Sequence, residues 1–203
     1  MTRTLALTFA LIGVVAAGSA FAQDARPGPG RVDVSLFPAG GTFFTEAERV
    51  AEPAFGNYEL GASVTFNANR FIGVEAEVGG ALGIQQELTF DGMTADVDPP
   101  DVVNYTGNLI VSIPNRSPVV PYVTAGAGGL SLLDRSGLGI QDTETFLTGN
   151  VGGCVKWYAG RWGLRGDYRF VAVRSNDEAP EFFGRETRYG HRVYGGVILS
   201  VAR

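Results

Sequence analysis

The chain has little of the chemistry that holds small exported proteins together: its 203 residues include one cysteine, Cys154, and one histidine, His191. A single cysteine cannot form an internal disulfide, so stability has to come from backbone pairing and side-chain packing. One histidine and one cysteine provide no ligand set for a metal ion. Positive charge is also scarce, with 16 Lys and Arg against 21 Asp and Glu, which argues against nucleic acid as a partner.

Long apolar runs are missing beyond the N-terminus. The longest candidate for a membrane helix, residues 119–133, is interrupted by Pro121 and three glycines, so a helical membrane protein is excluded. At the N-terminus, Arg3 precedes an apolar run from Leu5 to Ala17, and Ala20-Phe21-Ala22 has the small-x-small pattern that signal peptidase needs. This arrangement predicts a secretory signal peptide.

The signal sets the expected domain boundaries. We predict a cleaved signal peptide at residues 1–22, a flexible linker rich in Pro and Gly at 23–30, and one domain at 31–203. A membrane helix that stays in place is the alternative, but its apolar run is short for a span. The only cysteine lies far from the predicted cut, which argues against a lipid anchor.

Alternation of apolar and polar residues with a period of two dominates the rest of the chain. Between Asn57 and Asn67, for example, the even positions are Tyr, Leu, Ala, Val and Phe, and the odd positions are polar or Gly. We count about eight such segments, most of them near the ten residues that a tilted strand needs to cross a bilayer. Their approximate extents are 31–36, 57–67, 71–82, 103–113, 119–132, 147–157, 162–170 and 193–201.

The connections between these segments alternate in length. The short ones fall at 67–70, 114–118 and 158–161, and the long ones at about 45–56, 83–102, 134–144 and 174–186. Outer-membrane barrels have short periplasmic turns and long external loops. The sequence therefore predicts an all-β fold, an eight-stranded antiparallel transmembrane β-barrel, with both chain ends in the periplasm.

A water-soluble barrel such as a lipocalin alternates as well, with its apolar face inside. Two features favour an apolar face turned to lipid. Aromatic residues gather near the ends of strands, as two girdles at headgroup depth would require: Phe66, Tyr122, Trp157 and Trp162 near short turns, Tyr58 and Tyr105 near long loops. The polar face carries charges of both signs, predicted to form a structural network in the lumen: Glu75, Glu77, Lys156, Arg165, Asp167, Arg169 and Arg192.

Four segments resemble the small outer-membrane β-barrel family related to OmpA and OmpX: 71–80 (FIGVEAEVGG), 121–128 (PYVTAGAG), 149–153 (GNVGG) and 165–170 (RGDYRF). The resemblance implies the outer membrane of a Gram-negative cell, and insertion by the barrel-assembly machinery. These motifs encode pleat and packing, and they indicate no particular activity. The chain departs from the family at its end, where Leu199 and Val201 stand in place of the usual aromatic residues.

Candidates for catalysis and ligand binding are few. His191 is predicted to point outward, but Val193 occupies the position where the barrel-type lipid A deacylases that it resembles carry a serine. Gly126, Gly128 and Gly129 lack the spacing of a nucleotide loop, and no helix follows them. Four acidic residues of one long loop could attract calcium, but their spacing fits no EF-hand: Asp91, Asp96, Asp98 and Asp101.

We therefore expect no catalytic, cofactor-binding or metal-binding residues, and no enzymatic activity. The first hypothesis is a structural or surface-interaction barrel that acts through its external loops. The alternatives are a narrow channel for ions or small solutes and, less favoured, a soluble periplasmic ligand binder. The expected partners are outer-membrane lipid and the assembly machinery, without nucleic acid; the sequence does not identify an extracellular partner. A closed barrel has no free edge, so a monomer is expected.

Overall fold

A computed structural model of the protein describes residues 30–45, 57–83, 86–90, 93–97, 101–133, 144–174 and 187–201. The predicted signal peptide and most of the predicted linker lie outside these residues. Within them, no helix has the length and apolar character to cross a membrane.

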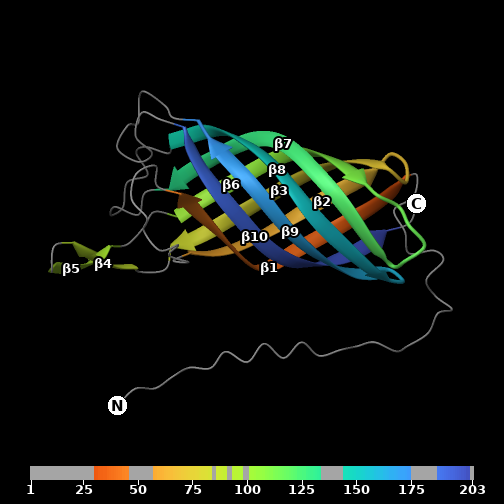
Figure 1. Ribbon diagram of the computed structural model, residues 1–203, viewed down its shortest axis with the longest axis horizontal. Helices are drawn as coiled ribbons and strands as arrows, with labels where there is room; N and C mark the ends of the chain where they lie inside the picture. The colour runs from red at the N-terminus through yellow and green to blue at the C-terminus, as the bar shows by residue number, and fades with distance from the viewer. Residues whose placement is uncertain are drawn as a thin grey trace, which may run out of the picture.

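Eight strands close into an antiparallel barrel in the order β1-β10-β9-β8-β7-β6-β3-β2 (Figure 1). This confirms the predicted all-β, eight-stranded barrel. A separate pair, β4 (Gln86–Phe90) and β5 (Met93–Val97), lies between β3 and β6 in sequence and was not predicted. The barrel strands are β1 (Arg31–Thr45), β2 (Asn57–Asn67), β3 (Ile72–Gly83), β6 (Asp101–Ser112), β7 (Val119–Leu133), β8 (Glu144–Ala159), β9 (Trp162–Val173) and β10 (Arg188–Val201).

The first and last strands close the barrel. β1 pairs with β10 from Val32 opposite Val201 to Thr45 opposite Tyr189, and its other edge pairs with β2. Every barrel strand therefore has a neighbour on both sides. Closure removes the unpaired backbone edges that would be costly in lipid.

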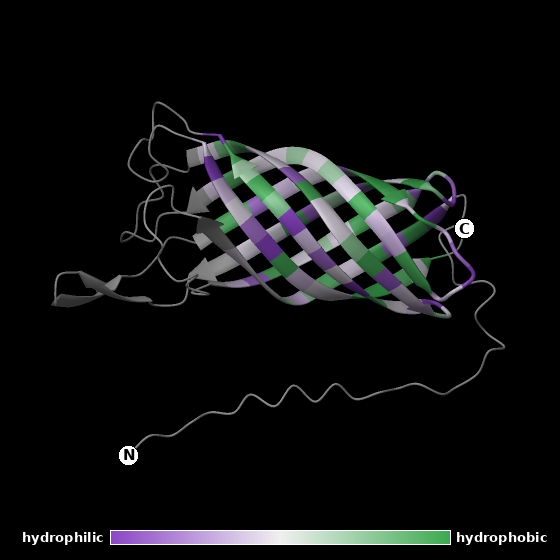
Figure 2. Cartoon of the chain, viewed as in Figure 1, coloured by the Kyte–Doolittle hydropathy of each residue, from purple (hydrophilic) through white to green (hydrophobic). Residues whose placement is uncertain are grey.

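The two faces of the barrel wall differ in polarity over most of their length, and hydrophobic and hydrophilic residues alternate along the strands (Figure 2). Apolar side chains such as Val74 and Leu109 are about half exposed on the outer face, whereas their sequence neighbours Glu75 and Asn108 are buried in the lumen. A water-soluble barrel would show the reverse arrangement. The outer face is thus the one that suits lipid.

The short turns are built by asparagine and glycine. In the β2–β3 turn, Asn69 Oδ1 accepts hydrogen bonds from the backbone N–H of Phe71 (2.7 Å) and Ile72 (2.9 Å). In the β6–β7 turn, Asn115 Oδ1 accepts a hydrogen bond from the backbone N–H of Ser117. Gly160 provides the positive φ of 65° that the β8–β9 turn needs. All three turns lie at the end of the barrel where β1 begins and β10 ends.

A β-bulge in β1 changes which residues face inward. The register against β10 shifts between Leu36 and Ala39. Before the bulge, odd-numbered residues such as Asp33 are buried in the lumen; after it, the even-numbered Thr42 reaches the lumen and contacts Glu59. Pro38, which has no N–H to donate, sits within the bulge. Only the part of β1 before this point could be predicted from the alternation in the sequence.

Candidate functional site

The interior of the barrel is the most highly charged part of the described structure. The structure places all seven residues of the predicted polar network in the lumen, each at most 4% exposed. Two further carboxylates, Asp33 and Glu59, belong to the same interior and were not included in the predicted network. The alternation had placed both on polar strand faces, but it gave no information about their partners.

Two arginines of β9 occupy the centre of the lumen. Arg165, Asp167 and Arg169 are spaced two residues apart, so all three side chains leave the same face of the strand. Arg165 contacts Asp167 with a forked pair of bonds (2.8 and 2.7 Å) and reaches Glu75 across the barrel at 2.6 Å. Glu75 also binds Arg169 at 2.9 Å, so one carboxylate bridges both guanidinium groups.

A second layer lies closer to the long-loop end. Arg192 of β10 forms ion pairs with Glu77 and, at 3.0 Å, with Glu59. Tyr194 donates its hydroxyl to Glu77 at 2.9 Å, and Thr42 donates to Glu59 at 2.7 Å. The β1 bulge is what brings Thr42 to this layer.

A third layer surrounds Asp33 near the short-turn end. Its carboxylate accepts hydrogen bonds from the hydroxyls of Tyr158 (2.9 Å) and Ser200, and Lys156 Nζ lies 3.5 Å away. Lys156 also lies over the ring of Tyr122, at 5.2 Å from the ring centroid. Strands that are far apart in sequence are thereby tied together beside the β1–β10 seam.

The interior charges nearly balance. Among the described residues, the three layers hold four cations and five carboxylates. Burying a charge is costly unless it is paired and hydrogen-bonded, and here each carboxylate contacts a cation. The cations are Lys156, Arg165, Arg169 and Arg192, and the carboxylates are Asp33, Glu59, Glu75, Glu77 and Asp167.

Apolar side chains also enter the lumen at both ends, a feature that was not predicted from the sequence. One cluster lies toward the long loops and contains Leu130, Phe146, Val171 and Val173. The other lies near the short turns and contains Val120, Tyr158 and Ile198. Simple alternation assigns the inner face to polar residues, so it gave no signal for these positions.

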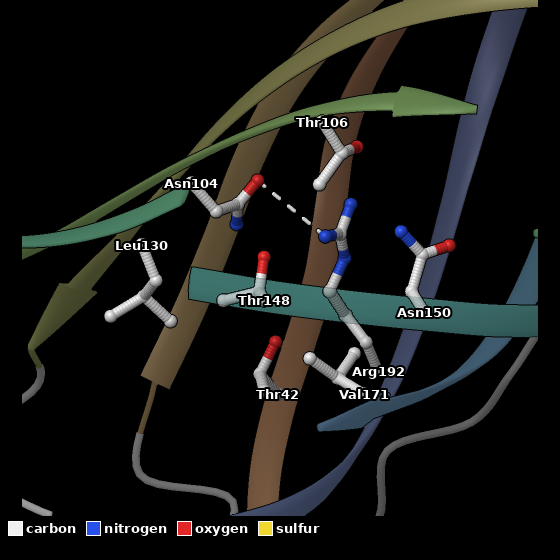
Figure 3. A pocket seen from close by; sticks show the side chains of 8 residues that line it. All are labelled: Thr42, Asn104, Thr106, Leu130, Thr148, Asn150, Val171 and Arg192. Carbon is white, nitrogen blue, oxygen red and sulfur yellow. Dashed lines mark hydrogen bonds between the residues drawn. The ribbon is translucent and has the colours of Figure 1, made fainter. Parts of the chain in front are cut away.

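A pocket lies between the Arg192 layer and the apolar cluster toward the long loops (Figure 3). It contains about 350 Å³ of empty space, a volume that includes open solvent. Its described walls present hydroxyls, amides, one guanidinium and two apolar side chains, without a carboxylate or an imidazole. Such a wall can form hydrogen bonds but offers no general base. The lining residues are Thr42, Asn104, Thr106, Leu130, Thr148, Asn150, Val171 and Arg192.

The aromatic residues on the outer face follow the predicted girdles with one exception. Phe66, Trp157 and Trp162 are exposed at the short-turn end, and Tyr58 and Tyr105 are exposed toward the long loops. The prediction for Tyr122 is wrong. Its ring is buried in the lumen and its hydroxyl donates to Asp167 at 2.6 Å. Apolar residues stand on both faces of β7, so the alternation did not decide which face turns inward.

Among the described residues, the remaining candidates are not gathered into a catalytic or metal-binding set. His191 faces outward as predicted, with its Nδ1 at 2.7 Å from the Tyr168 hydroxyl, and Cys154 pairs in register with Asp167 on the neighbouring strand. In the part of the chain that the structure describes, no three His, Cys, Asp or Glu residues are grouped to hold a metal. The side chains of the acidic loop (Asp91, Asp96, Asp98 and Asp101) lie outside the described part.

Comparisons with known proteins agree with this architecture. Neisserial surface protein A is 13% identical, with a TM-score of 0.55 over 83% of this chain and 95% of that one. Ail, the attachment invasion locus protein of Yersinia pestis, is 10% identical, with a TM-score of 0.51 over 85% of this chain and 99% of that one. No curated protein matched. The model of the outer membrane protein beta-barrel domain matches residues 7–185, and the chain belongs to this family of outer-membrane barrels.

Proposed function

We propose that the protein is a plugged outer-membrane anchor that holds its long external loops at the cell surface and acts through them, with a structural or surface-interaction role. The observation that carries this proposal is the central ion cluster. The side chains of Arg165, Arg169, Glu75 and Asp167 have no exposed surface and meet across the middle of the barrel. The interior of an eight-stranded barrel is narrow enough for its own side chains to fill it.

The two apolar clusters support the same proposal. They lie on either side of the ion cluster, one toward each end of the lumen. An ion that entered would have to pass the mostly apolar side chains of a cluster, and then separate paired charges. Both steps oppose conduction.

The proposal includes an orientation and a set of partners. The short turns face the periplasm, the long loops face outward, and lipid covers the apolar outer face. The barrel-assembly machinery inserts the chain. The protein works as a monomer, because β1 pairs with β10 and leaves the barrel without a free edge for another chain.

The absence of catalysis is also part of the proposal. His191, the only histidine, faces outward and contacts Tyr168, with Val193 two residues further along β10. None of the described residues that line the polar pocket could serve as a general base. The described residues therefore favour an interaction role over an enzymatic one.

Planar-bilayer recording distinguishes the anchor from a narrow channel. We expect the purified wild-type barrel to leave the bilayer silent, under conditions in which an open porin conducts. A stable unit conductance in the wild type that changes on Arg165→Ala would contradict the proposal. It would show that ions pass beside the central cluster.

A further inference from the structure

The short-turn end of the barrel has a charge pattern that the proposed function does not use. Each of its three turns carries one arginine and no acidic residue: residues 68–71 contain Arg70, 113–118 contain Arg116, and 160–161 contain Arg161. All three side chains are exposed. We call these three residues the arginine collar.

The collar is spread around the rim. The turns join β2 to β3, β6 to β7, and β8 to β9, so in the closed strand order they occupy three quarters of the circumference. The fourth quarter holds the start of β1, where Arg31 is half-buried. Asp33, the nearest carboxylate along β1, is buried in the lumen and bonded there. A cationic rim results.

The opposite end has the opposite charge. Each of the four connections there contains more acidic than basic residues in its sequence, at 46–56, 84–100, 134–143 and 174–187. The whole chain is acidic, with a formal net charge of −5. The arginines at the short turns are therefore not part of a generally basic surface.

Exposed aromatic rings accompany two of the three collar arginines and indicate the depth of the collar. The Arg70 guanidinium carbon lies 4.7 Å from the centroid of the Phe71 ring, and Arg161 directly precedes Trp162, which is 60% exposed. Aromatic rings on the outer face of a membrane barrel mark the interface between acyl chains and headgroups. A guanidinium at this depth lies at the level of the lipid phosphates.

We propose that the arginine collar binds the phosphate groups of anionic phospholipids. A guanidinium forms forked, charge-assisted hydrogen bonds with phosphate oxygens, and the neighbouring ring lies against the acyl chain of the same lipid. The partner class is a glycerophospholipid with net negative headgroup charge. The lipid leaflet involved is the one that faces the periplasm, a detail that rests on the proposed orientation.

The chain contains a probe for this contact. Its only two tryptophans, Trp157 and Trp162, are both on the outer face at the short-turn end and flank Arg161 in sequence. Bromine atoms on a lipid acyl chain quench tryptophan fluorescence on contact. The folded barrel is placed in vesicles of brominated phosphatidylglycerol mixed with unbrominated phosphatidylcholine, and then in the reverse mixture. The two quenching curves give the relative affinity of the two lipids beside these tryptophans.

We expect the wild-type barrel to prefer phosphatidylglycerol about fivefold, the factor that one basic residue near an anionic surface contributes. Arg161→Gln should bring the preference close to one, and Arg161→Lys should keep most of it. Arg174→Gln is the matched control, because Arg174 is an exposed arginine at the other end of the same strand, just after β9. Its preference should equal that of the wild type.

Folding is checked for every variant by the heat-dependent shift on a denaturing gel, so that a lost preference cannot come from an unfolded barrel. Equal quenching by both lipids in the wild type would overturn the proposal, and so would a preference that survives Arg161→Gln. Neither result would affect the plugged anchor, since bilayer conductance is measured separately.

Discussion

At the scale of single residues, the interior depends on carboxylates that each serve more than one cation. Glu75 contacts Arg165 at 2.6 Å and Arg169 at 2.9 Å, and it also accepts hydrogen bonds from Ser63 and Thr65. Removing one partner of a buried ion pair costs far more than the pair contributes, because the other charge stays buried without compensation. Glu75 is therefore the residue whose loss should disturb the lumen most.

We predict that Glu75→Ala destabilises the folded barrel by about 3–5 kcal/mol. Val74→Ala is the control on the adjacent residue of β3, whose side chain faces outward, and it should cost about 1 kcal/mol. Glu75→Gln keeps the side-chain size and one oxygen acceptor, so its cost should fall between the two. The free energy of unfolding is measured by urea titration of the barrel in lipid vesicles. Equal losses for Glu75→Ala and Val74→Ala would mean that the central cluster does not stabilise the fold.

The sequence predicted which charged residues enter the lumen better than it predicted their contacts. Strict alternation placed Glu75 and Glu77 on the polar face of β3 and Arg165 on the polar face of β9. In the structure, both of these faces line the lumen. Partners on opposite walls, such as Arg165 and Glu75, are 90 residues apart in sequence, and no local pattern encodes that pairing. Tyr122 was assigned to the wrong face because its strand has no clear polar side.

At the scale of elements, two strands approach each other through glycine. Gly126 of β7 pairs with Asn108 of β6, and a Cβ built on this glycine would overlap the Asn108 side-chain amide and the Gly107 carbonyl. The Asn108 amide is in use, because it donates to Glu75 at 3.3 Å and accepts from Asn150 at 3.0 Å. The glycine thus leaves room for the lumen network.

We predict that Gly126→Ala lowers the free energy of unfolding by about 1–3 kcal/mol, the usual cost of adding atoms to a filled interior. Gly107→Ala is the matched control. Gly107 is on the adjacent strand, and a Cβ there would meet no atom within 4 Å. The same urea titration serves for both. If the two alanine variants proved equally stable, close packing at Gly126 would not limit the fold.

The strands themselves could be predicted, but their irregularities could not. The predicted segments overlap all eight barrel strands, because a wall with lipid on one side and polar side chains on the other imposes a period of two. The β1 bulge breaks that period within a single strand, so the inward position of Thr42 needs the register against β10. The β4–β5 pair lies in a segment predicted to be a loop, since two five-residue strands make too short a pattern to recognise.

At the scale of the whole molecule, the barrel is polarised from end to end. One rim carries three short turns with the arginine collar, and the other carries four longer connections with an excess of acidic residues. Between them, the lumen contains apolar side chains near both ends and paired charges in the middle. The fold class and the outer-membrane location could be predicted from the sequence. The apolar clusters in the lumen required the structure, because each draws its members from three strands and no single strand reveals the cluster.

The orientation of this polarised molecule can be tested on one strand. Ser117 lies in the turn before β7, and Ser136 lies in the connection that follows β7. Cysteine substitutions at these two serines therefore mark the two ends of the barrel in variants that differ only in the position of the cysteine. In a Cys154→Ser background, we expect a membrane-impermeant maleimide to label Ser136→Cys on intact cells. Ser117→Cys should react only after the outer membrane is permeabilised, because short turns of such barrels face the periplasm. The reverse labelling pattern would place the arginine collar at the cell surface and overturn the proposed orientation, while leaving the eight-stranded fold intact.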